Sequence, residues 1–498
     1  MRPWWPLVAV CLGTFMLLVD VTIVNVALPP IAASLGTSFG GLQWVIDGYA
    51  LALAALLMVT GTLADRFGRR RLYLVGLGVF AAASLACGLA PSAGALVAAR
   101  VVQGAGGAAM FATTAALIAT TYHGRHRGTA FGVWGAVNGL AAAAGPLLGG
   151  LLTETWGWRA IFLVNLPVAV IAVALTLGVV SESASAGAGR VDVLGAATFT
   201  VASAALVYGL VAAGEQGWGA PDTVVALVLA AVALVAFLVV EHRSAAPMLD
   251  LTLFANPSFA ALMAAAAVLQ AGAFAHLALV SLWLQSVLGL SPIRAGLVVI
   301  PLSVASFVVS VAAGRFLHGG SPARPIAGGL ALIGVGVLLM TLVGPQSGPW
   351  ALFAGLVVAG LGVGLATPVL VSATLAVLPP HRAGVGSAAV NTFRQLGLAV
   401  GLAVLGTVFA GQVAGVLSGA GTTDPTTTAN ALAGGRATQV VGTGDATTAL
   451  VHQAFASGLD RVFTVAGVGA LVAAVLVPVC VRPAVAAPPE PVSEGAPA

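Results

Sequence analysis

The chain has no lysine and few charged residues of any kind. Only 7 % of its 498 residues are charged, all 19 basic residues are arginines, and 15 residues are acidic. A soluble chain carries about 25 % charged residues, so this composition excludes a soluble globular protein. The net charge of +4 does not indicate nucleic-acid binding, because the arginines fall in short loops between apolar runs. Without lysine, no ATP-binding loop of the Gly-x-x-x-x-Gly-Lys-Ser/Thr type exists.

Cysteine is equally scarce. The three cysteines, Cys11, Cys87 and Cys480, lie inside apolar runs, which indicates small packing residues rather than disulfides or metal ligands. No cluster of cysteine and histidine predicts a metal, and nothing supports an enzyme. We therefore expect no cofactor, no metal and no catalytic residue.

Long hydrophobic runs fill the chain instead. Hydrophobic residues make up 59 % of it, and the mean hydropathy is +1.07. Runs of about 20 apolar residues without strand-period alternation predict membrane-spanning helices rather than a barrel. The fourteen predicted spans are 6–28, 43–64, 72–90, 94–121, 128–151, 159–180, 193–213, 222–240, 258–285, 293–314, 325–343, 350–376, 385–410 and 460–481.

The loop arginines predict the orientation. With the N-terminus in the cytoplasm, thirteen fall on the cytoplasmic side and four outside, as the positive-inside rule requires. The first apolar run is too long for a signal-peptide core and is interpreted as an uncleaved span. We expect a multi-pass cell-membrane protein with both termini cytoplasmic, and a long, loosely ordered outer loop over residues 418–450.

One acidic residue, Asp20, lies within the first apolar run. An aspartate at the centre of a membrane helix costs roughly 3 kcal/mol on insertion scales, so it is a candidate for binding a proton or a cation. Arg100, inside the fourth run, is the partner we propose for it. Alternatively, Asp20 is held for packing alone and Arg100 extends to the outer interface.

A faint internal repeat divides the chain. The segment Gly61 to Arg71 follows the second run, and a degenerate copy beginning Gly314-Arg315-Phe316 follows the tenth. Aligning the two copies pairs spans 1–6 with spans 9–14. It leaves spans 7 and 8 as an inserted pair. We predict an N-terminal six-helix half (1–190), an inserted two-helix linker (191–245), a C-terminal six-helix half (246–482) and a disordered cytoplasmic tail (483–498).

The segment from Gly61 to Arg71 has the most specific pattern in the chain. A glycine ends a span, an acid follows four residues later, and an arginine cluster leads into the next helix. This pattern closely resembles the loop motif of the major facilitator superfamily. Five further segments resemble motifs of its fourteen-helix drug:proton antiporters. These segments are 18–29, 100–104, 139–150, 158–167 and 391–395.

The resemblance implies an all-α polytopic fold with two six-helix halves and two inserted central helices. It implies that Asp20 and Arg100 serve proton coupling. It also implies that Asp65 latches the two halves by meeting the start of the thirteenth span in the outward-facing state, where a carboxylate stabilises a helix N-terminus. Alternatively, Asp65 is a solvated loop acid and the arginines only anchor the topology. The latch residues are Gly61, Asp65, Arg66, Gly68 and Arg69.

The fifth span resembles the antiporter helix that seals one end of the cavity. Its strip of small residues lets another helix approach closely, and its proline frees a carbonyl and predicts a bend. Ordinary packing in a symporter would produce the same strip. The antiporter-helix residues are Gly139, Gly145, Pro146, Gly149 and Gly150.

Substrate contacts are predicted on the faces of three spans. Polar groups separated by apolar ones suit an amphipathic organic molecule, although interhelical hydrogen bonds would explain them equally well. Because the second half has no deep acid, neutral or monocationic substrates are favoured over dicationic ones. The candidates are Gln103, Phe111, Gln270, Phe274, Asn391, Arg394 and Gln395.

These features predict proton-coupled efflux of hydrophobic or amphipathic small molecules by alternating access. The expected partners are a small-molecule substrate, protons and the lipid bilayer, with no nucleic acid, and we expect a monomer. The alternatives are proton-linked uptake or export of an endogenous metabolite, and a non-transporting membrane sensor.

Overall fold

The computed structural model describes residues 4–36, 39–184, 192–244, 247–316, 321–378, 382–421, 424–433 and 445–481. All regular structure in these ranges is helical. This agrees with an apolar chain in lipid, where only a helix or a closed barrel satisfies every backbone polar group. The predicted cytoplasmic tail lies outside the described residues.

The first part of the chain forms six spans, the last of them made of two helices. They are α1 (Trp5–Leu35), α2 (Phe39–Phe67), α3 (Arg69–Gly88), α4 (Ala93–Thr121), α5 (Gly124–Trp156), and α6 (Ala160–Leu163) with α7 (Asn165–Val179). Two helices follow, α8 (Val193–Gln216) and α9 (Pro221–Arg243), and they pack against each other.

The remaining helices form the second part. They are η1 (Leu251–Ala255), α10 (Pro257–Gln270), η2 (Ala271–Ala275), α11 (His276–Leu282), η3 (Trp283–Val287), α12 (Pro292–Phe316), α13 (Ala323–Leu339), η4 (Met340–Leu342), η5 (Pro349–Leu352), α14 (Phe353–Val377), α15 (Ala383–Gly419), α16 (Pro425–Ala433) and α18 (Asp445–Cys480). Within the described ranges, thirteen helical segments are long and apolar enough to cross a membrane. The glycine-rich α5, of 33 residues, is long enough to be the fourteenth expected span.

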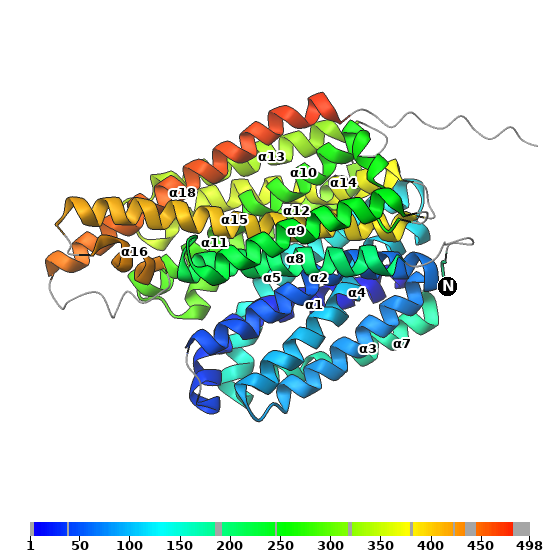
Figure 1. Cartoon of the computed structure of the whole chain (residues 1–498), viewed down its shortest axis with the longest axis horizontal. Coiled ribbons are helices and arrows are strands. Elements are labelled where there is room, and N and C mark those ends of the chain that lie inside the picture. The colour runs from blue at the N-terminus through cyan, green and yellow to red at the C-terminus, as the bar shows by residue number, and fades with distance from the viewer. Residues whose placement is uncertain are drawn as a thin grey trace, which may run out of the picture.

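The helices gather into two groups that meet along the molecule. Figure 1 shows α1, α3 and α7 on one side and α10, α13 and α18 on the other, with α8 and α9 across the front. The main contacts between the groups join α5 to α12 and α14, and join α15 to α2 and α4. The N-terminus and the junction of α2 with α3 lie at the same end of the bundle, which we call the N-terminal end (Figure 1).

The prediction of a loosely ordered loop over residues 418–450 is wrong where the structure describes it. Helix α16 occupies Pro425–Ala433, and α18 begins at Asp445 rather than near residue 460. Ala429 and Leu432 are buried, and α16 packs on α15. Burial of two apolar residues therefore makes a helix of a segment whose threonines and glycines suggested a loop.

The span from Pro257 to Val287 is not a uniform α-helix. Two π-helical turns, η2 and η3, interrupt it. Each π turn shifts the face that later residues present, so the helical face that carries the candidate Gln270 does not continue unchanged along the span. Such turns occur frequently at functional sites.

Candidate functional site

Asp20 and Arg100 are in contact in the interior of the first six spans. Asp20 on α1 has 0 % exposed surface and Arg100 on α4 has 1 %. The Arg100 Nη1 atom lies 2.5 Å from Asp20 Oδ2. The other carboxylate oxygen accepts hydrogen bonds from Gln103 Nε2 at 3.0 Å and Asn165 Nδ2 at 2.8 Å. The buried negative charge thus has a cation and two amide donors.

The guanidinium of Arg100 is also well supplied with partners. Its Nε donates to the carbonyl of Val45 at 2.9 Å, its Nη1 also donates to Gln103 Oε1 at 2.7 Å, and it lies 4.2 Å from the ring centre of Tyr49. Ser84 Oγ accepts hydrogen bonds from both amides. The residues of this Asp20 cluster are Asp20, Ser84, Arg100, Gln103 and Asn165.

Sequence reasoning did not assign Ser84 or Asn165 to this site, and it grouped Gln103 with the substrate contacts. The structure places Gln103 inside the Asp20 cluster with 0 % exposure. A polar side chain in an apolar run needs a partner, and this signal could have found Ser84 and Asn165. Which partner each one takes depends on the packing of α3 and α7 against α1.

Asp65 joins the first half to the second. Its two carboxylate oxygens accept hydrogen bonds from the backbone N–H groups of Gly384 at 2.8 Å and Val385 at 2.9 Å, in the first turn of α15. Arg69 donates to the same carboxylate through Nε at 2.9 Å and Nη2 at 2.6 Å. Asp65 and Arg69 are 6 % and 3 % exposed, so this contact, here called the latch, is a buried one.

Two glycines of the predicted motif permit this arrangement. A Cβ on Gly61 would collide with Ala388 Cβ and lie 2.8 Å from the carbonyl of Gly384, so α2 and α15 touch there.

Gly68 has a φ of +106°, which favours glycine, and it lies against the carboxylate of Glu182. Glu182 accepts from the N–H groups of Arg70 and Arg71 at the start of α3. The role of Glu182 was not predicted. Arg66 is half-buried, with its guanidinium 5.3 Å from the Phe67 ring centre.

The glycines of α5 face two different neighbours. A Cβ on Gly139 would lie 3.0 Å from the carbonyl of Ser303 on α12, and one on Gly150 would collide with Ile293 of the same helix. Gly145 instead packs against Thr22 of α1. Gly149 is buried, and α5 stays helical through Pro146, whose side chain is outside the described part. The strip therefore serves contacts both between and within the halves.

Four of the predicted substrate contacts come together between α4, α10 and α15. Arg394 donates from Nε to Gln270 Oε1 and from Nη1 to Asn391 Oδ1, each at 3.3 Å. Asn391 Nδ2 donates to the carbonyl of Phe111 at 3.4 Å, and the Arg394 guanidinium lies 6.0 Å from the Phe111 ring centre. The residues of this Arg394 cluster are Phe111, Gln270, Asn391 and Arg394.

The other two candidates lie beside this cluster. Phe274 is half-buried in the π turn that follows Gln270. Gln395 is half-buried next to Arg394 on α15. Neither has a contact that assigns it to a substrate, and both remain predictions.

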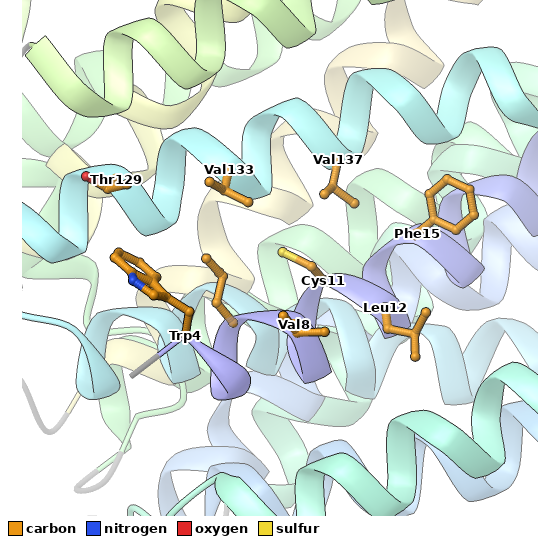
Figure 2. A pocket seen from close by; sticks show the side chains of 9 residues that line it. Trp4, Val8, Cys11, Leu12, Phe15, Thr129, Val133 and Val137 are labelled. Carbon is orange, nitrogen blue, oxygen red and sulfur yellow. The ribbon is translucent and has the colours of Figure 1, made fainter. Parts of the chain in front are cut away.

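An apolar groove of about 500 Å³ lies elsewhere, between α1 and α5. Figure 2 shows Thr129, Val133 and Val137 of α5 facing Val8, Cys11 and Leu12 of α1. Val8 is 46 % exposed, so the groove opens on the outer apolar surface. None of the charged residues described above lines the groove, so it has no charged side chain that could bind a proton or an ion.

Together, the membrane-spanning helices, the latch between the halves and the buried charges define a polytopic membrane transporter. Residues 10–402 match the model of the Major Facilitator Superfamily, and the chain belongs to this family. The structure is also similar to that of the human organic anion transporter MFSD10, with a TM-score of 0.65, 18 % identity, and coverage of 96 % of this chain and 100 % of that one. This similarity concerns the fold.

Several relatives of the chain are drug efflux or resistance proteins. The chain is 39 % identical to the multidrug resistance protein Stp of Mycobacterium tuberculosis over 82 % of this chain and 76 % of that protein. It is 38 % identical to a puromycin resistance protein of Streptomyces alboniger over 86 % of each. It is 33 % identical to a tetracenomycin C resistance and export protein of Streptomyces glaucescens over 95 % and 90 %. The chain is a transporter of this superfamily and not an enzyme.

Proposed function

We propose that the protein exports amphipathic small molecules across the cell membrane in exchange for protons, by alternating access. The observation that carries the proposal is the buried Asp20–Arg100 pair in a chain related to resistance and export proteins. A carboxylate in the membrane with a single cationic partner is suited to binding and releasing one proton.

In the proposed cycle, a proton from outside neutralises Asp20. The charged interaction with Arg100 is lost, while the amides of Gln103 and Asn165 stay within reach of the carboxyl group. The changed contacts between α1 and α4 favour the inward-facing state, in which the proton leaves and substrate binds. One proton crossing 100 mV supplies about 2.3 kcal/mol, which together with a pH gradient supports roughly hundredfold accumulation.

We assign the N-terminal end of the bundle to the cytoplasm, because thirteen of the seventeen loop arginines then lie on that side. The latch closes this end by joining Asp65 to the N-terminus of α15. The described conformation is therefore assigned as outward-facing, and the latch has to open during each cycle. The sealing role of α5 and the six-two-six division of the chain belong to the same proposal.

The test uses everted membrane vesicles with an acidic lumen. Adding puromycin or tetracenomycin C should cause proton efflux from the lumen, reported by a pH-sensitive dye, because inward drug movement is exchanged for protons. Symport would produce no such efflux. Asp20→Asn should abolish the signal and Asp20→Glu should retain part of it, since glutamate still titrates.

The control is Asp222→Asn, which changes an exposed acid at the start of α9 and should leave the proton signal unchanged. Thermal unfolding of each purified variant separates lost coupling from lost folding. Wild-type proton efflux in a folded Asp20→Asn variant would rule out Asp20 as the proton carrier.

A further inference from the structure

Arg394 lies deep in the membrane-spanning region. It follows Ala383, the first residue of α15, by eleven residues, which at 1.5 Å per residue places it about 16 Å along the helix. The hydrocarbon core is about 30 Å thick, so this depth is near the bilayer midplane. A cation at that depth needs a partner, as an acid does.

The partners that Arg394 has are neutral. Its two hydrogen bonds go to the amide oxygens of Gln270 and Asn391, both at 3.3 Å, which is longer than a typical bond to a guanidinium. Among the described residues, Arg394 forms no ion pair with a carboxylate. A guanidinium has five N–H donors, so several of them stay available for an incoming group.

The surrounding helices hold this cation in place. A Cβ on Gly397 would collide with the backbone of Ala267, and one on Gly401 would lie 2.9 Å from Ala271 and Ala275, so α15 is packed closely on α10 and η2. Asn391 is fully buried and bonded to the carbonyls of Ser387 and Phe111.

The cluster is less enclosed than the Asp20 cluster. Arg394, Gln270 and Phe274 are each only half-buried, unlike Asp20 and Arg100. The π turn begins directly after Gln270, which bonds Arg394, and includes Phe274.

We propose that the Arg394 cluster binds the carboxylate of amphipathic aromatic acids, and that such acids are among the substrates of the exporter. The carboxylate supplies the counter-ion that the protein does not, in a two-bond geometry that a guanidinium favours. Gln270 and Asn391 orient the guanidinium, and Phe111 and Phe274 contact the apolar part of the molecule. The assignment rests on the proposed export function. It adds acids to the neutral or monocationic substrates that the sequence favoured, because that expectation considered only the missing acidic residues of the second half.

The assignment has an electrical consequence. Exchanging one outgoing anion for one incoming proton moves two positive charges inward, whereas exchanging one cation for one proton moves none. Each charge is worth a factor of about fifty in accumulation per 100 mV. Export of the acid should therefore respond strongly to membrane potential at constant pH gradient.

The test compares three naphthalene probes that differ in charge: 2-naphthoate, its methyl ester, and 2-naphthylmethylammonium. Binding to the purified full-length protein is measured by titration calorimetry. The wild type should bind the carboxylate at least tenfold more tightly than the ester, and the ammonium most weakly. Arg394→Gln should remove the difference, and Arg394→Lys should keep part of it. Arg294→Gln, at an exposed arginine at the start of α12, should leave the order unchanged.

Equal wild-type affinity for the acid and the ester, no binding of the acid, or an unchanged preference in Arg394→Gln would each overturn the assignment. The vesicle assay keeps the two proposals apart. Proton efflux driven by puromycin without any preference for the acid retains export and rejects the anion site. An Arg394-dependent preference in a protein that moves no protons supports the anion site and rejects proton-coupled export.

Discussion

The buried arginines in the two halves of the transporter have different partners. In the first half, Arg100 has a carboxylate at 2.5 Å, a backbone carbonyl, an amide oxygen and an aromatic ring around it. In the second half, Arg394 has two amide oxygens at 3.3 Å. One cation is compensated inside the protein, and the other still needs an anion.

This difference suggests a division of roles between the halves. A compensated pair changes when a proton neutralises its acid, which suits coupling. An uncompensated cation changes when an anion arrives, which suits substrate recognition. Helix α4 connects the two sites, because it carries Gln103 and, about 12 Å further along at 1.5 Å per residue, Phe111.

Neutralising each arginine in turn tests this difference between the halves most directly. Arg100→Gln leaves the Asp20 carboxylate buried without its cation, and loss of one partner of a buried pair costs roughly 3–5 kcal/mol. Arg394→Gln removes a charge that has no counter-ion, so it should leave stability unchanged or slightly higher. Thermal unfolding of the detergent-purified proteins measures both effects.

The double variant Asp20→Asn/Arg100→Gln serves as the control. Removing both charges should recover a large part of the stability lost in Arg100→Gln, because no uncompensated charge remains. Equal destabilisation by Arg100→Gln and Arg394→Gln would contradict the difference between the halves.

A second comparison concerns the latch. Asp65→Asn removes the charge that faces Arg69 and the N-terminus of α15, and the new amide NH2 group cannot accept the N–H of Val385. Loss of a hydrogen bond to a charged group costs about 1.5–3 kcal/mol, so the N-terminal end of the bundle should open more often. Thiol labelling of a Ser387→Cys reporter, at a fully buried position in α15, should become faster in the Asp65→Asn background.

The matched control for the latch is Asp222→Asn in the same reporter background, which should label at the original rate. Equal labelling rates in the Asp65→Asn and Asp222→Asn backgrounds would show that Asp65 does not hold this end closed.

The smallest effect is expected for an exposed ion pair just before the start of α15. Arg382, which precedes α15, donates to Asp250 at 2.9 Å, with side chains 39 % and 28 % exposed. Hydrogen bonds from Thr252 and then from Arg382 hold the pKa of Asp250 below its usual range. A carboxyl with a lowered pKa stabilises the fold above its ordinary value and loses this contribution as the pH falls through the lowered value.

Asp250→Asn should therefore cost at most about 1 kcal/mol at neutral pH, as exposed ion pairs do. The melting temperatures of the variant and the wild type should converge as the pH falls below about 4, the ordinary value for aspartate. A difference that grows in acid would contradict this assignment.

Much of the fold could be predicted from the sequence. Apolar runs located the spans, because lipid requires every backbone group in a span to be bonded within the helix, and α1 to α5 lie where these runs predicted them. The same reasoning failed at the start of α18 and at α16. The burial of Ala429 and Leu432 in α16 depends on packing against α15. Local composition does not contain that information.

For the sites, the sequence identified Asp20 and Arg100 as costly in a membrane, because the cost of a charge depends on its depth along its own helix. It predicted Arg394 only as a substrate contact. How each charge is compensated depends on the packing of helices that are distant in the sequence. Packing of α1, α3, α4 and α7 gives Asp20 its cation and amide donors, and packing of α10 and α15 gives Arg394 neutral partners. Asn391 lies one helical turn before Arg394, but the other partners are about eighty residues or more away in the sequence, and no local pattern encodes those pairings.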